Sequence, residues 1–559
     1  MFKTTASSFQ DTRSTIWFFL NKTNTDTQNT QKKDLRFQYW NFGLFRWQLF
    51  ALCIFLGAYL LFQLEPLIGK FILPWFGGSP AVWTTCMLFF QLVLLAGYAY
   101  AHLSLAHLKP TQQAWVHIAL LTIALITLPI APSVNWKPDD SSNPTLSILL
   151  LLLATVGLPF FVLSATSPLM QAWFVRVCPG RSPYPLYALS NLGSFLALLS
   201  YPFAFEPFFK LSQQTFGWSL GFVLFTAVCG GLAYDFRRKA ITKEIIATPR
   251  VIDDELRLSD RVSPTLLWLF WLALPAITST LLLAVTNQLC QDVASIPFLW
   301  VLPLSSYLLS FIFSFGLHQY YRRDIFLPAA CLGVVGLVCA LYLGSKIDLL
   351  WQVGIYNVGL FLCCMICHGE LYRLRPQPSH LTAYYLAISI GGAMGGIFVS
   401  LLAPLIFPLY LEFHIGLFAC CLFTMLAIAL DPSVFTGKLA RRKAIGFGSC
   451  ALLLLATYLI KHVYEVSVAE TVISRNFYGI LRIDDRDSDN SVLARRVLRH
   501  GAIDHGFQFL APEKRGLPTA YYRPETGIGI TLNHLSLSHD RRIGIVGLGV
   551  GTLLSYGQP

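Results

Sequence analysis

Charged residues are scarce in this sequence. Only 13% of its 559 residues are Asp, Glu, Lys or Arg, whereas 55% are hydrophobic. Soluble proteins average about 25% charged residues, because their surface must face water. The composition therefore excludes a string of soluble domains, which the length alone would allow. It predicts a polytopic membrane protein whose main partner is the lipid bilayer.

Cysteines in polar loops are also lacking. Nearly all of the 13 cysteines lie in apolar runs, for example Cys363, Cys364 and Cys367, and none follows Cys450. A secreted disulfide scaffold would place its cysteines in polar loops. We interpret them as free thiols that act as small hydrophobic side chains.

The net charge of +12 does not indicate a nucleic-acid partner. In membrane proteins a basic excess collects in the cytoplasmic loops. Alternate loops of this sequence carry the basic residues Lys109; Arg176 and Arg181; Arg237, Arg238 and Lys239; Arg322 and Arg323; Arg373 and Arg375; and Arg441 and Arg442. The positive-inside rule predicts that these loops and the N-terminus are cytoplasmic. We expect a multi-pass protein of the inner (cytoplasmic) membrane.

Twelve apolar stretches of spanning length, about 20 residues each, lie between residues 46 and 430. They centre near residues 56, 91, 121, 155, 195, 223, 275, 306, 334, 360, 391 and 420. A thirteenth run, 444–460, is at the short end of what can span, so an extra membrane helix there stays an alternative. The predicted division of the chain is a polar, disordered cytoplasmic tail (1–45), a first six-helix half (46–234), a cytoplasmic linker (235–262), a second six-helix half (263–430) and a C-terminal domain (461–559).

The two halves contain similar segments. Residues 79–83, which open the second span, resemble residues 296–300 in the eighth, and residues 187–193 in the fifth span resemble residues 385–391 in the eleventh. Both matches are offset by six spans, so equivalent helices run in the same direction. Parallel six-helix repeats are how major-facilitator-type transporters are built. The predicted fold is thus a six-plus-six helical membrane bundle, with about 12–13 transmembrane helices, followed by a small α/β domain.

The C-terminal residues show a different pattern. Residues 466–483 and 492–509 alternate as strands do, an acidic turn at 484–489 separates them, and residues 526–537 are predicted to be helical. Residues 543–546 then predict a buried strand that leads into a glycine turn at Gly547, Gly549 and Gly551 and a helix, the start of a truncated Rossmann-like fold. Glycines are needed where a nucleotide approaches the backbone closely. A tight turn without a ligand stays the alternative.

His500 and His505 flank an aspartate, a combination that could suggest a metal site. Side chains alternate between the two faces of a strand, so these two rings are expected to point in opposite directions. We therefore predict no metal site here.

Three segments resemble the family of fused major-facilitator and spermidine-synthase-like membrane proteins. They are EPLIGK (65–70) with FGGSPAVW (76–83), the string HGAIDHGFQ (500–508), and GLGVGTL (547–553). Soluble spermidine synthases have a β-strand domain and a Rossmann-like domain that binds decarboxylated S-adenosylmethionine. The resemblance implies a site for that cofactor, or a related S-adenosyl compound, at Gln508, Gly547, Gly549 and Gly551.

The resemblance also implies a polyamine or other small amine as the substrate. Tyr521 and Tyr522 stand where the family has Tyr-His, so Tyr522 replaces the expected histidine on the amine side of the pocket. The acidic ribose ligand and the catalytic aspartate of the family would lie beyond Pro559. We therefore assign no residue of this chain as catalytic.

Three charged residues near the ends of apolar runs are further candidates. Glu65 and Lys70 lie near the end of the first span and Glu206 near the end of the fifth. Charges within a membrane are costly and usually face a bundle interior or a cavity. The alternative is that they are interfacial and extend to water. His368 and Glu370 are expected to be interfacial.

The position of the C-terminal domain depends on residues 444–460. If this run crosses the membrane, the domain lies outside, where S-adenosyl cofactors are not expected. Two functional alternatives therefore stand beside the spermidine-synthase-like interpretation: a facilitator-type transporter of an amine or organic ion with a degenerate regulatory tail, and a non-catalytic membrane scaffold.

Overall fold

The computed structural model describes residues 46–138, 144–178, 182–242, 262–290, 297–316, 320–377, 380–431, 437–501, 503–535 and 543–557. The predicted tail, 1–45, and residues 243–261 of the predicted linker lie outside the described residues.

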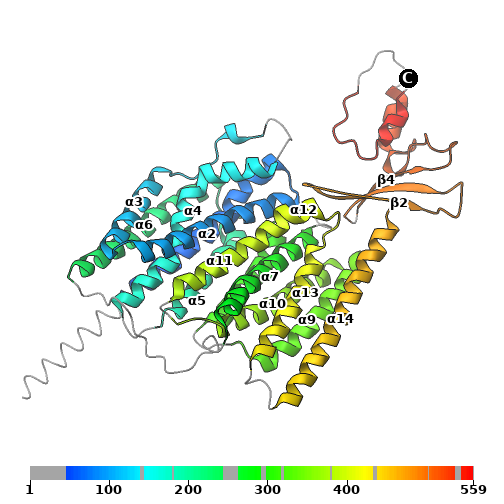
Figure 1. Cartoon of the computed structure of the whole chain (residues 1–559). Helices are drawn as coiled ribbons and strands as arrows, with labels where there is room; N and C mark the ends of the chain where they lie inside the picture. Colours follow the sequence, from blue (N-terminus) through cyan, green and yellow to red (C-terminus); the bar gives the residue numbers. More distant parts are fainter. Residues whose placement is uncertain are drawn as a thin grey trace, which may run out of the picture.

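Apolar helices form the main body of the protein (Figure 1). In the described part of the chain, eleven helices are long and apolar enough to cross a membrane, and two shorter apolar helices accompany them. Lipid cannot hydrogen-bond the backbone, so a helix, which pairs its own N–H and C=O groups, is the structure that such runs adopt. The helices are a first span, Arg46–Phe76, then α2 Pro80–His107, α3 Pro110–Ile126, α4 Pro144–Val177, α5 Tyr184–Ser200, α6 Leu211–Ile241, α7 Pro264–Cys290, α8 Pro297–Phe315, α9 Arg323–Leu343, α10 Leu349–Arg373, α11 Leu381–Ile397, α12 Ala403–Ile406, α13 Glu412–Leu430 and α14 Lys438–Ala469.

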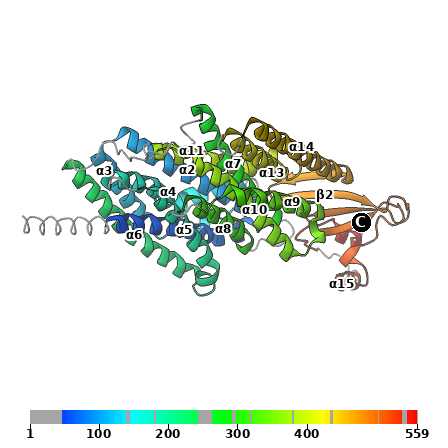
Figure 2. The ribbon, with the colours of Figure 1, turned by 90° about the horizontal axis from the view of Figure 1, so that it is seen from below.

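The two helical halves repeat each other's packing. Helix α2 packs on α4 as α8 packs on α10. Helices α5 and α11 each continue into a five-residue π-helical turn, Tyr201–Phe205 and Phe398–Leu402. The halves meet where α2 contacts α11 and where α5 contacts α8. Figure 2 shows α2 to α6 on one side of the body and α9, α10, α13 and α14 on the other.

Glycines at equivalent positions let helices approach closely within each half. A Cβ atom on Gly193 of α5 would lie 2.7 Å from the carbonyl oxygen of Phe55 in the first span. A Cβ atom on Gly391 of α11 would overlap the carbonyl oxygen of Leu272 in α7. Both contacts join helices that are four spans apart, and small residues are what allow two helix backbones to meet in a membrane.

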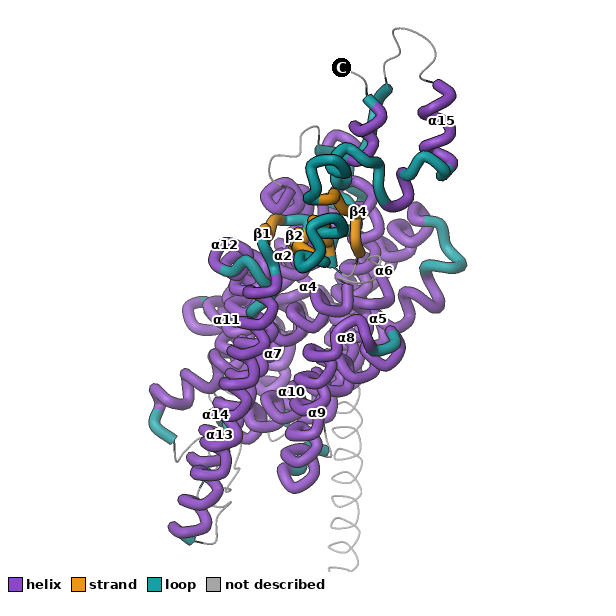
Figure 3. The backbone as a smooth tube through the Cα atoms, turned by 90° about the vertical axis from the view of Figure 1, so that its right-hand side faces the viewer, coloured by secondary structure: helices purple, strands orange, loops and turns teal. Residues whose placement is uncertain are grey.

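Helix α14 is the thirteenth apolar run, and it extends further at both ends than the predicted 444–460. Its first two turns carry the basic residues Arg441 and Arg442. Its other end lies next to the sheet (Figure 1), and the sheet lies at one end of the helical body (Figure 3). We call the end of the bundle with the basic loops the basic face and the opposite end, where the sheet lies, the sheet face. Since α14 is long and apolar enough to span, the basic loops and the sheet lie on opposite faces.

A four-stranded antiparallel sheet follows α14, in the order β1-β2-β3-β4. The two long strands predicted at 466–483 and 492–509 are instead two hairpins, because glycines with positive φ, Gly479 and Gly501, allow turns within them. Residues 466–469 belong to α14. The strands are β1 Val472–Asn476, β2 Gly479–Arg486, β3 Arg495–His500 and β4 Ile503–Phe509.

The last described residues form less regular structure than predicted. Helix α15, Gly527–Leu535, agrees with the predicted helix at 526–537. Residues 543–546 form no strand, and a short 3-10 helix, Thr552–Tyr556, follows the glycine turn. Ile543 is 62% exposed, so this run has neither the hydrogen-bonded neighbour nor the burial that a Rossmann strand requires. The predicted strand is therefore wrong for the described residues.

A buried ion pair fastens the sheet to the bundle. The guanidinium group of Arg475 in β1 donates two hydrogen bonds to the carboxylate of Glu412 in α13, at 2.8 and 3.2 Å, and one to the carbonyl of Leu409. The two side chains are 4% and 0% exposed. The Arg475 guanidinium also stacks over the ring of Tyr410, 4.4 Å from its centroid. The junction is thus specific and fully desolvated.

Replacing Gly391 with Ala should destabilise the protein by about 1–3 kcal/mol, the usual cost of inserting an atom into a packed core. Replacing Gly392 with Ala should leave stability nearly unchanged, because a Cβ atom there would have no neighbour within 4 Å. Thermal unfolding of the purified variants in detergent measures both. Equal unfolding temperatures for the two variants would contradict the close approach of α11 to α7.

Replacing Arg475 with Ala leaves the Glu412 carboxylate buried and unpaired, so we expect a loss of about 3–5 kcal/mol. The matched control is Arg496→Ala, which breaks an ion pair to Asp485 on the exposed side of the sheet and should cost at most about 1 kcal/mol. Limited proteolysis reports detachment of residues 470–535. Equal digestion rates for the two variants would refute the anchoring role.

Candidate functional site between the two helical halves

A cavity with an empty volume of about 1080 Å³ lies between the two halves of the bundle. Its walls come from the first span, α2, α4 and α5 of one half and from α7, α8 and α11 of the other. Central cavities between two helical repeats are where membrane carriers bind their substrates. We therefore take this cavity as the candidate functional site.

Stacked aromatic pairs lie toward the two ends of the cavity. Near the sheet face, Trp83 of α2 stacks on Trp300 of α8, with ring centroids 3.6 Å apart and an interplanar angle of 22°. Near the basic face, Tyr187 of α5 stacks on Tyr385 of α11, at 4.7 Å and 15°. Each pair joins positions that the sequence repeat makes equivalent. Equivalent residues touch one another only along a twofold axis, so these stacks mark the pseudo-twofold axis between the halves.

Glu65 supplies the charge of the cavity. Its side chain lines the cavity and the residue is only 2% exposed. Its Oε2 atom has no hydrogen-bond partner among the described residues. Glu65 is the one carboxylate among the described residues that line the cavity, and none of them is a Lys, Arg or His. Glu65 is therefore a buried acidic side chain with no basic side chain beside it among the described lining residues.

Aromatic rings and small polar groups form much of the remaining wall. Tyr98, Tyr187, Tyr307 and Phe311 present ring surface, and Gln91, Ser190, Asn191, Ser194 and Ser389 present amides and hydroxyls. Gln91 donates from Nε2 to the hydroxyl of Ser279 at 3.0 Å and so bridges the two halves. The wall can thus surround an organic group with ring faces while a few hydrogen-bonding groups orient it.

Lys70 and Glu206, the other two intramembrane candidates, lie elsewhere. Lys70 Nζ is 3.2 Å from Glu206 Oε1, and the two side chains are 39% and 32% exposed. They meet at the sheet-face ends of the first span and of the fifth, outside the cavity. Of the three candidates, the structure places only Glu65 in the cavity.

The residues predicted to hold a cofactor gather beside β4. The turn glycines Gly547, Gly549 and Gly551 have φ angles of 88°, 57° and 74°, which is the left-handed backbone that favours glycine. The side chain of Val550 lies over Gly506 of β4. Two positions further along that strand, Gln508 donates from Nε2 to the carbonyl of Arg515 at 3.1 Å.

The two predicted substrate tyrosines lie near the same strand. Tyr521 donates its hydroxyl to the carbonyl of His505 at 3.4 Å, and the rings of Tyr521 and Tyr522 are 4.4 Å apart. A hydrogen bond with Tyr521 raises the pKa of the Tyr522 hydroxyl. The structure therefore collects these residues in one region, without the strand–turn–helix arrangement that the sequence predicted.

The two rings of His500 and His505 lie together, contrary to the expectation from strand alternation. A tight turn and a register shift at Leu498 and Arg499 bring the rings within 6.0 Å of each other, 25° from parallel. The described residues contain no group of three His, Cys, Asp or Glu side chains arranged to hold a metal ion.

A second cavity, the vestibule, lies at the sheet face and was not predicted. It has an empty volume of about 1310 Å³ and is lined by Thr84, Asn287 and Ser400 of the bundle and by the β1–β2 turn, 476–479. Phe477 of that turn packs on the core of the membrane bundle. The β1–β2 turn thus covers part of the sheet-face end of the bundle. A sequence pattern gives no signal for this contact, since it joins segments far apart in the chain.

An ion-pair network at the basic face was not predicted from the sequence either. Arg323 donates to Glu370 and to Asp431, both at 2.7 Å, and Arg373 donates to Asp431 at 2.6 Å. Glu370 and His368 are 1% and 0% exposed, so both side chains are buried in the protein and do not extend to water. His368 instead lies inside the second half, bonded to Ser310 and Thr278.

Comparisons with known proteins do not identify a family for this chain. No family model and no curated protein matches the chain. Among solved structures, the chain is similar to the inward-open conformation of the xylose transporter XylE from E. coli. The TM-score is 0.42 and the sequence identity 12%, over 71% of this chain and 98% of that one. So low a similarity assigns neither a family nor a substrate.

If the aromatic pairs close the cavity, Trp83→Ala should open its sheet-face end and Tyr187→Ala its basic-face end. Hydrogen–deuterium exchange of the purified protein measures this. We expect faster exchange in the first turns of α2 and α8 for Trp83→Ala, and in the first turns of α5 and α11 for Tyr187→Ala. Each variant is the control for the other. An equal increase at both ends in both variants would indicate loss of packing instead of loss of closure.

Proposed function

We propose that this protein is a membrane carrier for a small amine or another small organic cation, and that the central cavity is its binding site. The observation that carries the proposal is Glu65, a buried carboxylate with no basic side chain among the described residues that line its cavity. An ionised carboxylate in a low-dielectric site is unfavourable unless a charge of opposite sign joins it, and without one it takes up a proton. A cationic solute is the partner that this cavity lacks.

The aromatic wall supports the same class of solute. Ring faces attract ammonium groups through their quadrupoles, most strongly where water is excluded. Tyr98, Tyr187, Tyr307 and Phe311 supply such faces around the cavity. An organic anion would gain little from them and would be repelled by an ionised Glu65 carboxylate.

The repeat supplies a way to move the solute. In carriers built from two repeats, alternating access arises when one half rocks against the other around a fixed site. The stacked pairs Trp83–Trp300 and Tyr187–Tyr385 each join one half to the other. Separating one pair while keeping the other would expose the cavity to one face at a time.

A second candidate function follows from the residues beside β4. The left-handed turn at Gly547–Gly551 lies against the strand that carries Gln508, and this favours an S-adenosyl ligand such as decarboxylated S-adenosylmethionine. The sheet lies on the face opposite the basic loops, where the predicted orientation puts no such cofactor. An unchanged unfolding temperature of the intact protein with saturating S-adenosyl ligands would remove this candidate.

Replacing Glu65 with Gln should abolish the uptake of cationic solutes, because the neutral amide removes the charge while keeping the shape. The measurement is the uptake of radiolabelled mono- and polyamines into proteoliposomes. Glu465→Gln is the matched control: it removes an exposed α14 carboxylate that pairs with Lys461 and should keep wild-type uptake. Amine uptake at the wild-type rate in Glu65→Gln, or none by the wild type, would overturn the proposal.

A further inference from the structure

The Glu65 carboxyl group lies in a cavity that the two halves close around. It lines the cavity and is 2% exposed, and the stacks Trp83–Trp300 and Tyr187–Tyr385 lie toward the two ends. An ionised carboxylate in such surroundings is unfavourable unless a cation joins it. Glu65 therefore has two favourable states, one protonated with the cavity empty of solute and one ionised beside a bound cation.

The other titratable side chains near Glu65 are weaker acids. Those that line the cavity are the phenols Tyr98, Tyr187 and Tyr307, and the described lining residues of α4, α7 and α11 include no titratable side chain. The thiol of Cys86 in α2 lies within electrostatic range of Glu65. Phenols and thiols lose their protons only at a higher pH than carboxylic acids do. Glu65 is thus the group in this part of the described chain that exchanges its proton most readily.

Charged side chains on the neighbouring helices lie away from the cavity. Lys70, five residues beyond Glu65 on the same helix, pairs with Glu206 at the sheet-face ends of their helices. Helix α6 packs on the first span, and its charged side chains fall within 235–239, in its last two turns at the basic face. Neither helix therefore brings a described cation into the cavity.

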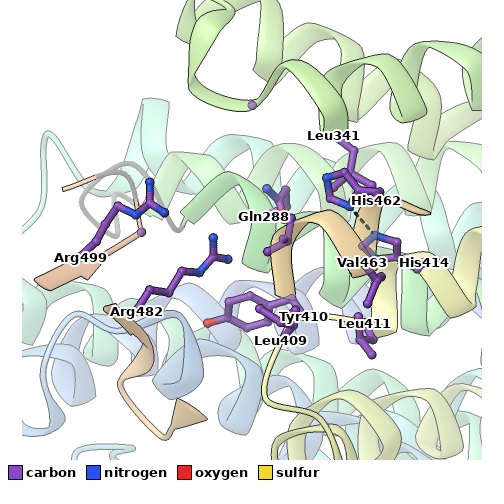
Figure 4. Close-up of a pocket in the computed structure, with 13 residues that line it drawn as sticks. Gln288, Leu341, Leu409, Tyr410, Leu411, His414, His462, Val463, Arg482 and Arg499 are labelled. Carbon is purple, nitrogen blue, oxygen red and sulfur yellow. Dashed lines mark hydrogen bonds between the residues drawn. The ribbon is translucent and has the colours of Figure 1, made fainter. Parts of the chain in front are cut away.

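Basic side chains gather instead in a separate pocket, where the sheet meets the bundle. Figure 4 shows Arg482 and Arg499 on one side of that pocket and His414 and His462 on the other. The pocket shares no lining residue with the central cavity. Among the described lining residues, nothing supplies Glu65 with a positive charge, so the charge comes from a solute or from a proton.

A cation and a proton compete for this one carboxyl group. When a monovalent cation binds, the O–H bond of the carboxylic acid breaks, the proton leaves to water, and the cation takes its place beside the carboxylate. The net charge of the cavity is the same before and after, so neither state takes an unbalanced charge into the bundle. An ionised Glu65 without a cation is the unfavourable state, so the carrier returns with a proton bound.

Resting on the carrier function proposed above, we propose that the protein is an exchanger that moves one proton, bound to Glu65, against each monovalent organic cation. Because the two ligands share one site, each lowers the affinity of the other by the same factor. Alternating access between the two faces then carries the cation in one direction and the proton in the other.

The first test measures proton release when butylammonium or tetraethylammonium binds to the purified full-length protein in weakly buffered detergent solution. A pH-indicator dye should report one proton released per cation bound. Affinity should rise about tenfold for each unit that the pH is raised, the limit for one displaced proton. Glu65→Asp keeps a carboxyl group and should still release the proton. Cys86→Ser should also release it, which assigns the proton to Glu65 and not to the neighbouring thiol.

The second test measures the uptake of tetraethylammonium into proteoliposomes, since this cation has no proton to lose and does not cross the bilayer as a neutral amine. An acidic interior should accelerate uptake several-fold. A membrane potential, negative inside and set with potassium and valinomycin, should not drive uptake, because the exchange of one charge for one charge moves no net charge. Glu465→Gln should behave like the wild type in both conditions.

The outcomes separate this inference from the carrier function. Cation binding without proton release, or uptake that follows the membrane potential and ignores the pH gradient, would overturn the exchange and leave the carrier function in place. If the wild type neither bound nor took up these cations, the carrier function would fall and the exchange with it.

Discussion

Stacking between equivalent aromatic residues sets the geometry on which the rest of the bundle depends. Trp83 meets Trp300 and Tyr187 meets Tyr385, so the two halves face each other about a pseudo-twofold axis. The cavity follows from this arrangement, because the halves are held together near its two ends and enclose a space between them. Within each half, Gly193 and Gly391 let helices approach at backbone distance, which makes each half compact.

Charged residues are scarce, and the buried ones lie in distinct parts of the structure. Arg475 and Glu412 neutralise each other where the sheet joins α13, and Arg323, Glu370 and Asp431 do so at the basic face. Glu65 differs because no basic side chain lines its cavity in the described chain. Buried ion pairs such as Arg475–Glu412 fix how segments of the chain pack together. The proposed binding of a cationic solute rests on this difference.

Much of the bundle could be predicted from the sequence, because apolar runs of spanning length have one stable backbone structure in lipid. The helices follow the predicted runs, and the tryptophans of the two similar segments, Trp83 and Trp300, stack on each other. The C-terminal region was predicted less well. The alternating pattern correctly indicated β-strands. The turn at Gly479 and the exposure of residues 543–546 depend on tertiary contacts, which the pattern does not contain.

The sequence by itself determined the membrane class, the helical repeats and the presence of a sheet after the last helix, because burial in lipid and backbone pairing are local requirements. Only the tertiary structure decided which charged residues pair with each other and which one lines the cavity. Glu65, Lys70 and Glu206 all lie near the ends of apolar runs in the sequence. In the structure, Lys70 and Glu206 pair with each other, whereas Glu65 faces the cavity. Likewise, Arg475 and Glu412 are far apart in the sequence and meet in a buried ion pair only in the folded protein. Electrostatic roles depend on distance in space, which spacing along the chain does not fix.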